Sequence, residues 1–311
     1  MQLVKESYTF ADLQNWEAVA GAIDPPIRLG VLGDPVANSL SPQMQNAALE
    51  QSGLKMQYAR FRIGAEELGA ALRLLPSLKF VGANLTIPHK ITGTALVDEL
   101  DDFARRVGAI NTVLVDGEKL VGFNTDGPGF SRAIRQEFWV DLRDLRVLLF
   151  GAGGGAGRAI AMQCAAEGCE RLMLVNRNHE KAQQLAAELK PFFSDTRVTG
   201  PVARLEAVPW EEQALRFQIA NADIIVNATS LGMKRSDPPL LPVALIAPHL
   251  MVYDTVYTRA RTPLLHAAVD AGARVANGTS MLLHQGALSF ETWFDRDAPI
   301  AAMQVALSST A

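Results

Sequence analysis

A glycine-rich turn follows an apolar segment in the middle of the chain. Residues 145–150 are almost entirely apolar, and residues 151–157 read GAGGGAG. Glycines in such a turn let a pyrophosphate approach the backbone, and the free N–H groups that begin the next helix attract its charge. The spacing Gly151-x-Gly153-x-x-Ala156 fits the dinucleotide-binding fingerprint, with alanine in the last place. A glycine turn that binds no ligand is the alternative. The predicted cofactor contacts are Gly151, Ala152, Gly153, Gly154, Gly155 and Ala156.

The residues at the end of the next apolar segment favour NADP over NAD. Residues 171–175 are followed by Asn176-Arg177-Asn178, with Lys181 one helical turn later and no carboxylate at that tip. NAD sites usually place Asp or Glu there for the ribose hydroxyl, whereas the planar fork of arginine suits a 2′-phosphate. We therefore predict an NADP site at Arg177 and Lys181. The alternative is that Arg177 is a solvated surface charge.

Four stretches before the glycine turn are dense in hydroxyl and amide side chains. Such groups suit a ligand covered with hydroxyls, although each stretch alone is compatible with ordinary turn chemistry, because Asn, Ser, Asp and Gly favour turns. The stretches are GDPVANSLSP at 33–42, GANLTIPHK at 82–90, GAINT at 108–112 and GFNTDG at 122–127.

Together these stretches resemble the shikimate dehydrogenase family. The match continues with NATSLGM at 227–233, DTVY at 254–257 and NGTSMLLHQG at 277–286, in the family's order and spacing, and it covers about residues 27–295. The resemblance implies an enzyme that interconverts 3-dehydroshikimate and shikimate with NADP, in the chorismate route to aromatic amino acids.

Three alternatives stay open beside this activity. They are a quinate dehydrogenase of the same family, an aminoshikimate enzyme, and a non-catalytic protein that binds shikimate-pathway compounds. Ser41 favours shikimate over quinate, because family members that prefer quinate often have threonine at the matching position. Retention of the glycine turn and of the residues that match the catalytic pair argues against a non-catalytic protein.

The resemblance implies roles on the substrate side. Lys90 and Asp126 match the catalytic pair beside the oxidised hydroxyl, and Ser39 and Ser41 match the serines that bind the shikimate carboxylate. The positions that match ligands of the ring hydroxyls are Asn84, Thr86, Asn111 and Gln285, and the position that matches a tyrosine of the substrate pocket is Tyr257.

The resemblance also implies roles on the cofactor side. The matching positions are Asn176, Arg177 and Lys181 for the adenosine phosphate, Thr229 for the cofactor, and Gly278 and Met281 beside the nicotinamide. The glycine turn is one residue longer than the family's commonest form, which leaves the exact phosphate contacts open.

The implied reaction needs a proton donor at the ketone oxygen, within about 2.6–3.2 Å. Lys90 can donate as an ammonium and accept as an amine, and Asp126 can orient it. We expect the two to work as a unit, and which of them transfers the proton stays open. His89 is expected to be structural or exposed, because neighbours on a helix do not share a face.

These motifs predict an α/β fold with two domains and a cleft between them. The 311 residues suffice for about two domains of ~100–200 residues each. The apolar strands that alternate with helices after residue 145 predict a parallel sheet covered on both faces. We assign residues 127–277 to a Rossmann-like NADP-binding domain, and residues 1–126 to a substrate-binding domain. The resemblance implies that residues 278–311 return to the substrate-binding domain. Residues 1–26 look like an extension of open purpose.

Composition excludes several partners. A formal net charge of -4 provides no basic field for nucleic acid, and no apolar run suits a signal peptide or a membrane span. Cys164 and Cys169 are predicted to share a helix and cannot easily bridge each other, and no zinc-ligand spacing occurs. We therefore expect a cytoplasmic protein with a small-molecule substrate and no metal. A monomer and a homodimer both stay open.

Overall fold

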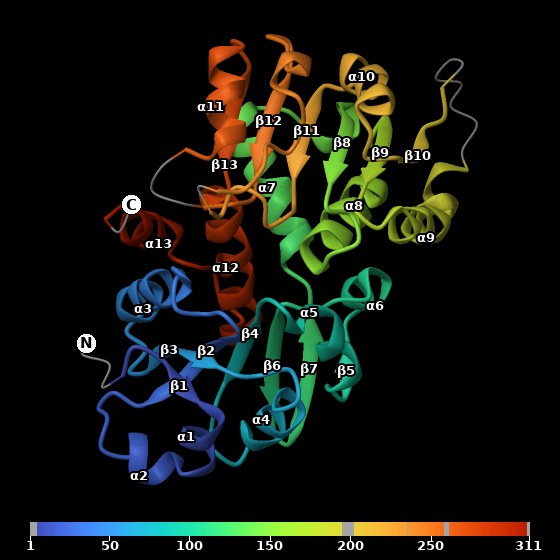
Figure 1. The fold of residues 1–311 in the computed structure, drawn as a ribbon. Helices are drawn as coiled ribbons and strands as arrows, with labels where there is room; N and C mark the ends of the chain where they lie inside the picture. The colour runs from blue at the N-terminus through green and yellow to red at the C-terminus, as the bar shows by residue number, and fades with distance from the viewer. Residues whose placement is uncertain (1–4, 195–201, 235, 258–260, 310–311) are drawn as a thin grey trace. The chain divides into compact units, whose positions relative to one another are not determined.

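The chain forms two compact α/β units. The computed structural model describes residues 5–194, 202–234, 236–257 and 261–309 (Figure 1). One unit comprises residues 1–125 and 283–311, and the other comprises residues 126–282. The predicted α/β class with parallel strands is confirmed. The predicted domain boundaries after residues 126 and 277 stay a prediction.

The first unit contains a seven-stranded mixed sheet in the order β1-β3-β2-β4-β6-β7-β5. The strands β1, β3, β2 and β4 run parallel, whereas β6 is antiparallel to both β4 and β7. The strands are β1 Tyr8–Thr9, β2 Ile27–Gly33, β3 Gln57–Arg62, β4 Gly82–Leu85, β5 Glu99–Leu100, β6 Thr112–Asp116 and β7 Lys119–Phe123. The helices are α1 Phe10–Gln14, α2 Trp16–Ala20, α3 Ser41–Gln51, α4 Leu68–Leu74, α5 His89–Thr92, η1 Gly93–Ala95, α6 Asp102–Val107 and α13 Ile300–Ser308.

The second unit contains a six-stranded parallel sheet in the order β10-β9-β8-β11-β12-β13. The chain runs outward from β8 in one direction and then, from β11, in the other, which is the doubly wound dinucleotide-binding arrangement. Its strands are β8 Arg146–Phe150, β9 Arg171–Val175, β10 Leu205–Val208, β11 Ile224–Asn227, β12 Met251–Asp254 and β13 Arg274–Asn277. Its helices are α7 Asp126–Phe138, η2 Leu142–Asp144, α8 Gly155–Ala166, α9 His179–Leu189, η3 Lys190–Phe193, α10 Glu212–Ala220, η4 Val243–Leu245 and α11 Pro263–Asp270. Helix α12, Thr279–Phe294, begins in this unit and ends in the first.

The central strands of this sheet end in register. Phe150 of β8 pairs with Asn227 of β11, and Asn227 pairs with Asp254 of β12. Asp254 in turn pairs with Asn277 of β13. Three neighbouring strands therefore end on polar residues at the carboxyl edge, where open parallel sheets bind their ligands.

The N-terminal extension is part of the first unit's core. Strand β1 pairs with β3, and the Tyr8 and Trp16 side chains are buried against Phe61. The ring centroids of Trp16 and Phe80 lie 5.5 Å apart. Residues 8–20 thus cover an apolar edge of the sheet, which accounts for most of a segment whose purpose the sequence left open.

The two cysteines do not share a helix. Helix α8 ends at Ala166, and Gly168 follows with φ at +71°, a conformation that favours glycine and ends helices. Cys169 therefore lies beyond the helix that carries Cys164, and the prediction of a shared helix is wrong. Both thiols are buried and free, and burial raises the pKa of Cys169 to about 12.

No helix in the described part of the chain combines the length and the apolar character that crossing a membrane requires.

Replacing Trp16 by alanine tests the packing of the extension. We expect Trp16→Ala to lower the free energy of unfolding by about 3–5 kcal/mol, because it removes a buried ring from an aromatic cluster. Chemical denaturation measures the change. Trp139→Ala is the matched control: this ring is 85 % exposed, so its loss should cost no more than about 0.5 kcal/mol. Equal effects at the two positions would contradict a packed extension.

Candidate active site

The glycine turn after β8 lies against the backbone that follows β11. Gly151 has φ at +86°, and a Cβ there would lie 2.7 Å from the carbonyl carbon and oxygen of Ala228 and 2.9 Å from the Thr229 nitrogen. Only glycine satisfies both restrictions. The turn thus occupies the point between β8 and β11 where the strand order reverses, which is the position of a dinucleotide site.

Helix α8 packs most closely against the glycine turn at Gly157. A Cβ at Gly157 would lie 2.1 Å from the Gly151 carbonyl oxygen, so this residue takes the packing role that the fingerprint predicts for Ala156. The longer turn is thereby accommodated. Helix α8 begins at Gly155 after an extended Gly154 that has no side-chain cap, and its first N–H groups suit an anion.

The tip of β9 lies beside the same turn. The Asn176 side chain accepts a hydrogen bond from the Gly153 N–H (3.3 Å) and donates one to the Asn178 carbonyl (2.9 Å). A Cβ at Gly153 would lie 2.9 Å from Cβ of Lys181. The side chains of Arg177 and Lys181 are exposed. The structure therefore brings Asn176, Lys181 and Thr229 to the glycine turn.

Gly278 and Met281 are held at the start of α12. A Cβ at Gly278 would lie 2.0 Å from the Thr255 carbonyl oxygen, which leaves room for glycine alone. The Met281 N–H donates to the buried Tyr253 hydroxyl (3.1 Å), and burial raises the pKa of that hydroxyl. Tyr257, three residues beyond β12, is half-buried.

In the first unit, Asn111 is fully hydrogen-bonded by the protein. Its amide donates to the Thr125 hydroxyl (2.8 Å) and to Oε1 of Gln285 (3.1 Å). Its oxygen accepts from the Thr125 N–H (2.8 Å) and from the Thr112 hydroxyl (3.2 Å). These contacts use both donors and both acceptor positions of the side chain. Among these partners Gln285 is half-buried, whereas Thr112 and Thr125 are buried.

Asn84 lies in the same network. Its oxygen accepts from the Tyr58 hydroxyl (2.8 Å), and its amide lies 3.0 Å from the Ser289 hydroxyl and 3.1 Å from that of Thr112. Ser289 also lies 2.7 Å from the Thr112 hydroxyl. Sequence reasoning missed Tyr58 and Ser289, since neither lies in one of the polar stretches.

The predicted carboxylate ligands and Thr86 lie at the ends of neighbouring elements. Ser41 begins α3, and its N–H donates to the Ser39 hydroxyl (3.3 Å). Arg60 on β3 donates twice to the Ser39 carbonyl (3.1 and 2.7 Å), which holds the loop in place. Thr86 follows β4, and its N–H donates to the Leu32 carbonyl (3.0 Å).

The predicted catalytic pair is divided between the units. Lys90 is half-buried in α5, and its carbonyl accepts from the Ile110 N–H (2.7 Å). Asp126 begins α7 and is 3 % exposed. Their pairing stays a prediction. His89 is fully buried, with Nε2 at 2.8 Å from the Ile63 carbonyl oxygen, which gives it a structural role.

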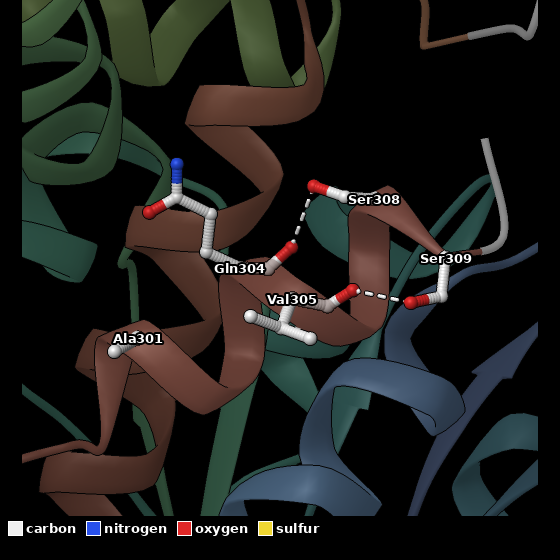
Figure 2. Close-up of a pocket in the computed structure, with 5 residues that line it drawn as sticks. All are labelled: Ala301, Gln304, Val305, Ser308 and Ser309. Carbon is white, nitrogen blue, oxygen red and sulfur yellow. Dashed lines mark hydrogen bonds between the residues drawn. The ribbon is translucent and has the colours of Figure 1, made fainter.

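A surface hollow on α13 is lined by none of the predicted site residues. Figure 2 shows it lined by Ala301, Gln304, Val305, Ser308 and Ser309. Both serine hydroxyls donate to carbonyls of their own helix (3.0 and 2.9 Å), and no lining residue is charged. Within the described ranges, no group of three or more His, Cys, Asp and Glu residues is arranged to hold a metal ion.

The fold and the glycine turn define the class of protein: a two-unit α/β protein with a doubly wound dinucleotide-binding unit. Comparison with known families specifies the class further. The family described as "Shikimate dehydrogenase substrate binding domain" matches residues 31–113. "Shikimate / quinate 5-dehydrogenase" matches residues 133–234, and "Shikimate 5'-dehydrogenase C-terminal domain" matches residues 278–307.

Individual relatives agree. The chain is 41% identical over 281 residues to "Shikimate dehydrogenase (NADP(+))" of Methanopyrus kandleri, which covers 90% of this chain and 94% of that one. A crystal structure of a shikimate dehydrogenase with NADP+ superposes with a TM-score of 0.81 and 31% identity, over 91% of this chain and 94% of that one. The Thermus thermophilus enzyme, solved with NADP(H) and shikimate, has a TM-score of 0.79 and 35% identity, over 92% and 100%. The chain belongs to the shikimate dehydrogenase family.

The glycine turn offers a matched pair of substitutions. We expect Gly151→Ala to lower the free energy of unfolding by at least about 2 kcal/mol, because it combines a left-handed backbone with a clash against Ala228. Gly154→Ala is the control. Gly154 is extended and has 3.6 Å to its nearest neighbour, so the change should stay below about 1 kcal/mol. Thermal unfolding compares the two, and equal melting temperatures would contradict the close approach of Gly151.

Proposed function

We propose that this chain is an NADP-dependent shikimate dehydrogenase, which reduces 3-dehydroshikimate to shikimate and catalyses the reverse oxidation in chorismate biosynthesis. The observation that carries the proposal is 41% identity, over nine tenths of the chain, to a protein of that name. The doubly wound sheet with its glycine turn supports it independently, because this arrangement is suited to a dinucleotide.

The residues of the second unit fit the cofactor. The turn at Gly151 and Gly153 leaves no space for side chains, while a Cβ at Gly154 would make only an ordinary contact of 3.6 Å with the Gly151 carbonyl oxygen. The start of α8 offers N–H groups to a pyrophosphate. Arg177 and Lys181 bind the 2′-phosphate, and Asn176 holds the Gly153 end of the turn. Thr229, Gly278 and Met281 complete the cofactor contacts. The nicotinamide, when bound, supplies or accepts the hydride.

The residues of the first unit bind the substrate. Ser39 and Ser41 bind the carboxylate, and Asn84, Thr86, Asn111 and Gln285 bind the ring hydroxyls, with Tyr257 of the second unit in the pocket. The Asn84 amide already bonds to protein hydroxyls, and the Asn111 amide already bonds to Gln285. A ligand that brings several correctly spaced hydroxyls replaces such bonds, whereas an apolar ligand leaves buried polar groups unpaired.

Lys90 moves the proton of the reaction. As an ammonium it donates to the ketone oxygen during reduction, and as an amine it accepts that proton during oxidation. Asp126 orients the lysine. The location of the protein in the cytoplasm and the lack of a nucleic-acid partner stay predictions.

Removal of Lys90 tests the activity. Wild-type protein should reduce NADP with shikimate, and do so faster than with quinate or aminoshikimate, in an assay at the NADPH absorbance band. We expect Lys90→Ala to lower kcat by about 10²–10⁴-fold, as is typical for loss of a general acid–base group. Lys55→Ala, at an exposed lysine of the same unit, should leave kcat unchanged. A Lys90→Ala enzyme with wild-type turnover would refute the assignment.

Removal of Arg177 tests the choice of cofactor. The wild-type protein should have a lower KM for NADPH than for NADH. Arg177→Ala should raise the KM for NADPH by about tenfold or more and leave that for NADH nearly unchanged, because only NADPH loses a charged hydrogen bond. Arg143→Ala, at an exposed arginine of the same unit, is the control. A wild-type preference for NADH would contradict the prediction.

A further inference from the structure

A buried carboxylate ends the fifth strand, in sheet order, of the second unit. Asp254 is the last residue of β12, and its exposed fraction is 0%. It lies in register with Asn227, the equally buried last residue of β11. The proposed reaction assigns no role to Asp254, so we examine the contacts of its carboxylate.

Three donors surround the Asp254 carboxylate. The Asn227 amide donates to Oδ1 (2.9 Å), as does the Val256 N–H (3.1 Å), and the Thr262 hydroxyl donates to Oδ2 (2.6 Å). Thr262 also caps α11 by accepting from the Leu265 N–H (3.3 Å). One side chain therefore connects the end of β11, the loop after β12 and the start of α11.

Burial of this group is unfavourable. Burial raises the pKa of the Asp254 carboxyl, and the hydrogen bonds from Thr262, Val256 and Asn227 lower it only in part. Apolar residues often stabilise a fold more than a buried charge does. A carboxylate at the ligand-binding edge is therefore better explained by what it positions than by stability.

Asn227 transmits the position of the carboxylate to the next segment. Its oxygen accepts from both the N–H (3.0 Å) and the hydroxyl (2.7 Å) of Thr229, and its amide also donates to the Leu231 carbonyl (3.0 Å). Asp254 helps to set the orientation of the Asn227 amide, together with the Thr229 N–H and the Leu231 carbonyl, because an ionised carboxylate accepts hydrogen bonds and cannot donate them. Asn227 thus links Asp254 to residues 228–231.

The same segment supports the glycine turn. The Ala228 N–H donates to the Phe150 carbonyl (2.9 Å), and the Ala228 carbonyl oxygen would lie 2.7 Å from a Cβ added at Gly151. A shift of Ala228 or Thr229 therefore displaces the turn that faces the pyrophosphate.

We propose that Asp254 is a positioning residue for the cofactor, which fixes Asn227 and thereby the segment against which the glycine turn packs. This inference rests on the proposed function in that it takes the dinucleotide to be NADP. Asp254 acts through Asn227 and is not proposed to touch the substrate or the cofactor.

Asp254→Asn tests the proposal with little change in size. The new amide brings a donor toward the three donors that surround it. We expect the dissociation constant of NADPH, measured by fluorescence titration without shikimate, to rise about tenfold or more, as for a lost hydrogen bond to a charged group. At saturating NADP, kcat for the oxidation of shikimate should stay within about threefold of wild type, since only the binding of the cofactor is weakened.

Asp223→Asn is the matched control. Asp223 lies at the amino end of β11, where it accepts hydrogen bonds from the backbone N–H (2.8 Å) and Nε (3.0 Å) of Arg146. This substitution should lower the melting temperature and leave the NADPH dissociation constant unchanged. An equal rise in both variants would mean general loosening of the sheet and would overturn the proposal.

Two further variants keep the test decisive if Asp254→Asn does not fold. Thr262→Val removes one donor to the carboxylate, and Thr262→Ser retains it; the proposal requires weaker NADPH binding in the first and wild-type binding in the second. Equal binding in this pair, or a folded Asp254→Asn protein within about twofold of wild type, overturns it. A wild-type protein that binds NADPH but does not oxidise shikimate contradicts the proposed function alone.

Discussion

The contact between the glycine turn and the segment after β11 is the constraint on which the second unit depends. Gly151 meets the backbone of Ala228 and Thr229 at a distance that no side chain permits, and its positive φ sends the chain directly from β8 into α8. Because the strands are parallel, the loops after β8, β9, β11 and β12 emerge at one edge. The glycines thus do more than make room for a ligand. They let the loops of two non-consecutive strands form one surface.

The first unit builds its site by another principle. Asn84, Asn111 and Gln285 are oriented by hydrogen bonds to hydroxyls and to one another, so the amides are preorganised before a ligand arrives. Every buried amide needs hydrogen-bond partners, and a ligand binds well when its own groups form hydrogen bonds in place of those that its binding breaks. Under the proposed function, selectivity for a polyhydroxylated ring follows from the cost of leaving such groups unpaired, which exceeds the gain from any single new hydrogen bond.

The carboxylates at the two edges of the parallel sheet have different surroundings. At the amino edge, Asp223 accepts hydrogen bonds from Arg146, and a part-exposed ion pair of this kind adds modest stability. At the carboxyl edge, Asp254 is fully buried among neutral donors, and burial raises its pKa. Among the described residues, the side chain of Asp254 has neutral hydrogen-bond donors and lies where loops have to be held in place. Two aspartates at opposite edges of the same sheet thus serve different purposes: Asp223 stabilises the fold, and Asp254 positions loops for ligand binding.

The sequence by itself determined the class of fold, the glycine turn and most of the candidate site residues, because strand periodicity, glycine spacing and short polar motifs are local features that neighbouring residues carry. Only the tertiary structure decided the rest. Ser289 reaches Asn84 across 205 positions, and no local pattern indicates such a contact. The close contact predicted at Ala156 is made by Gly157, because a Cβ there would meet the Gly151 carbonyl oxygen. Helix α8 ends before Cys169, because Gly168 has a left-handed backbone conformation. The part that Asp254 plays arises in the same way, since strand register alone brings it beside Asn227.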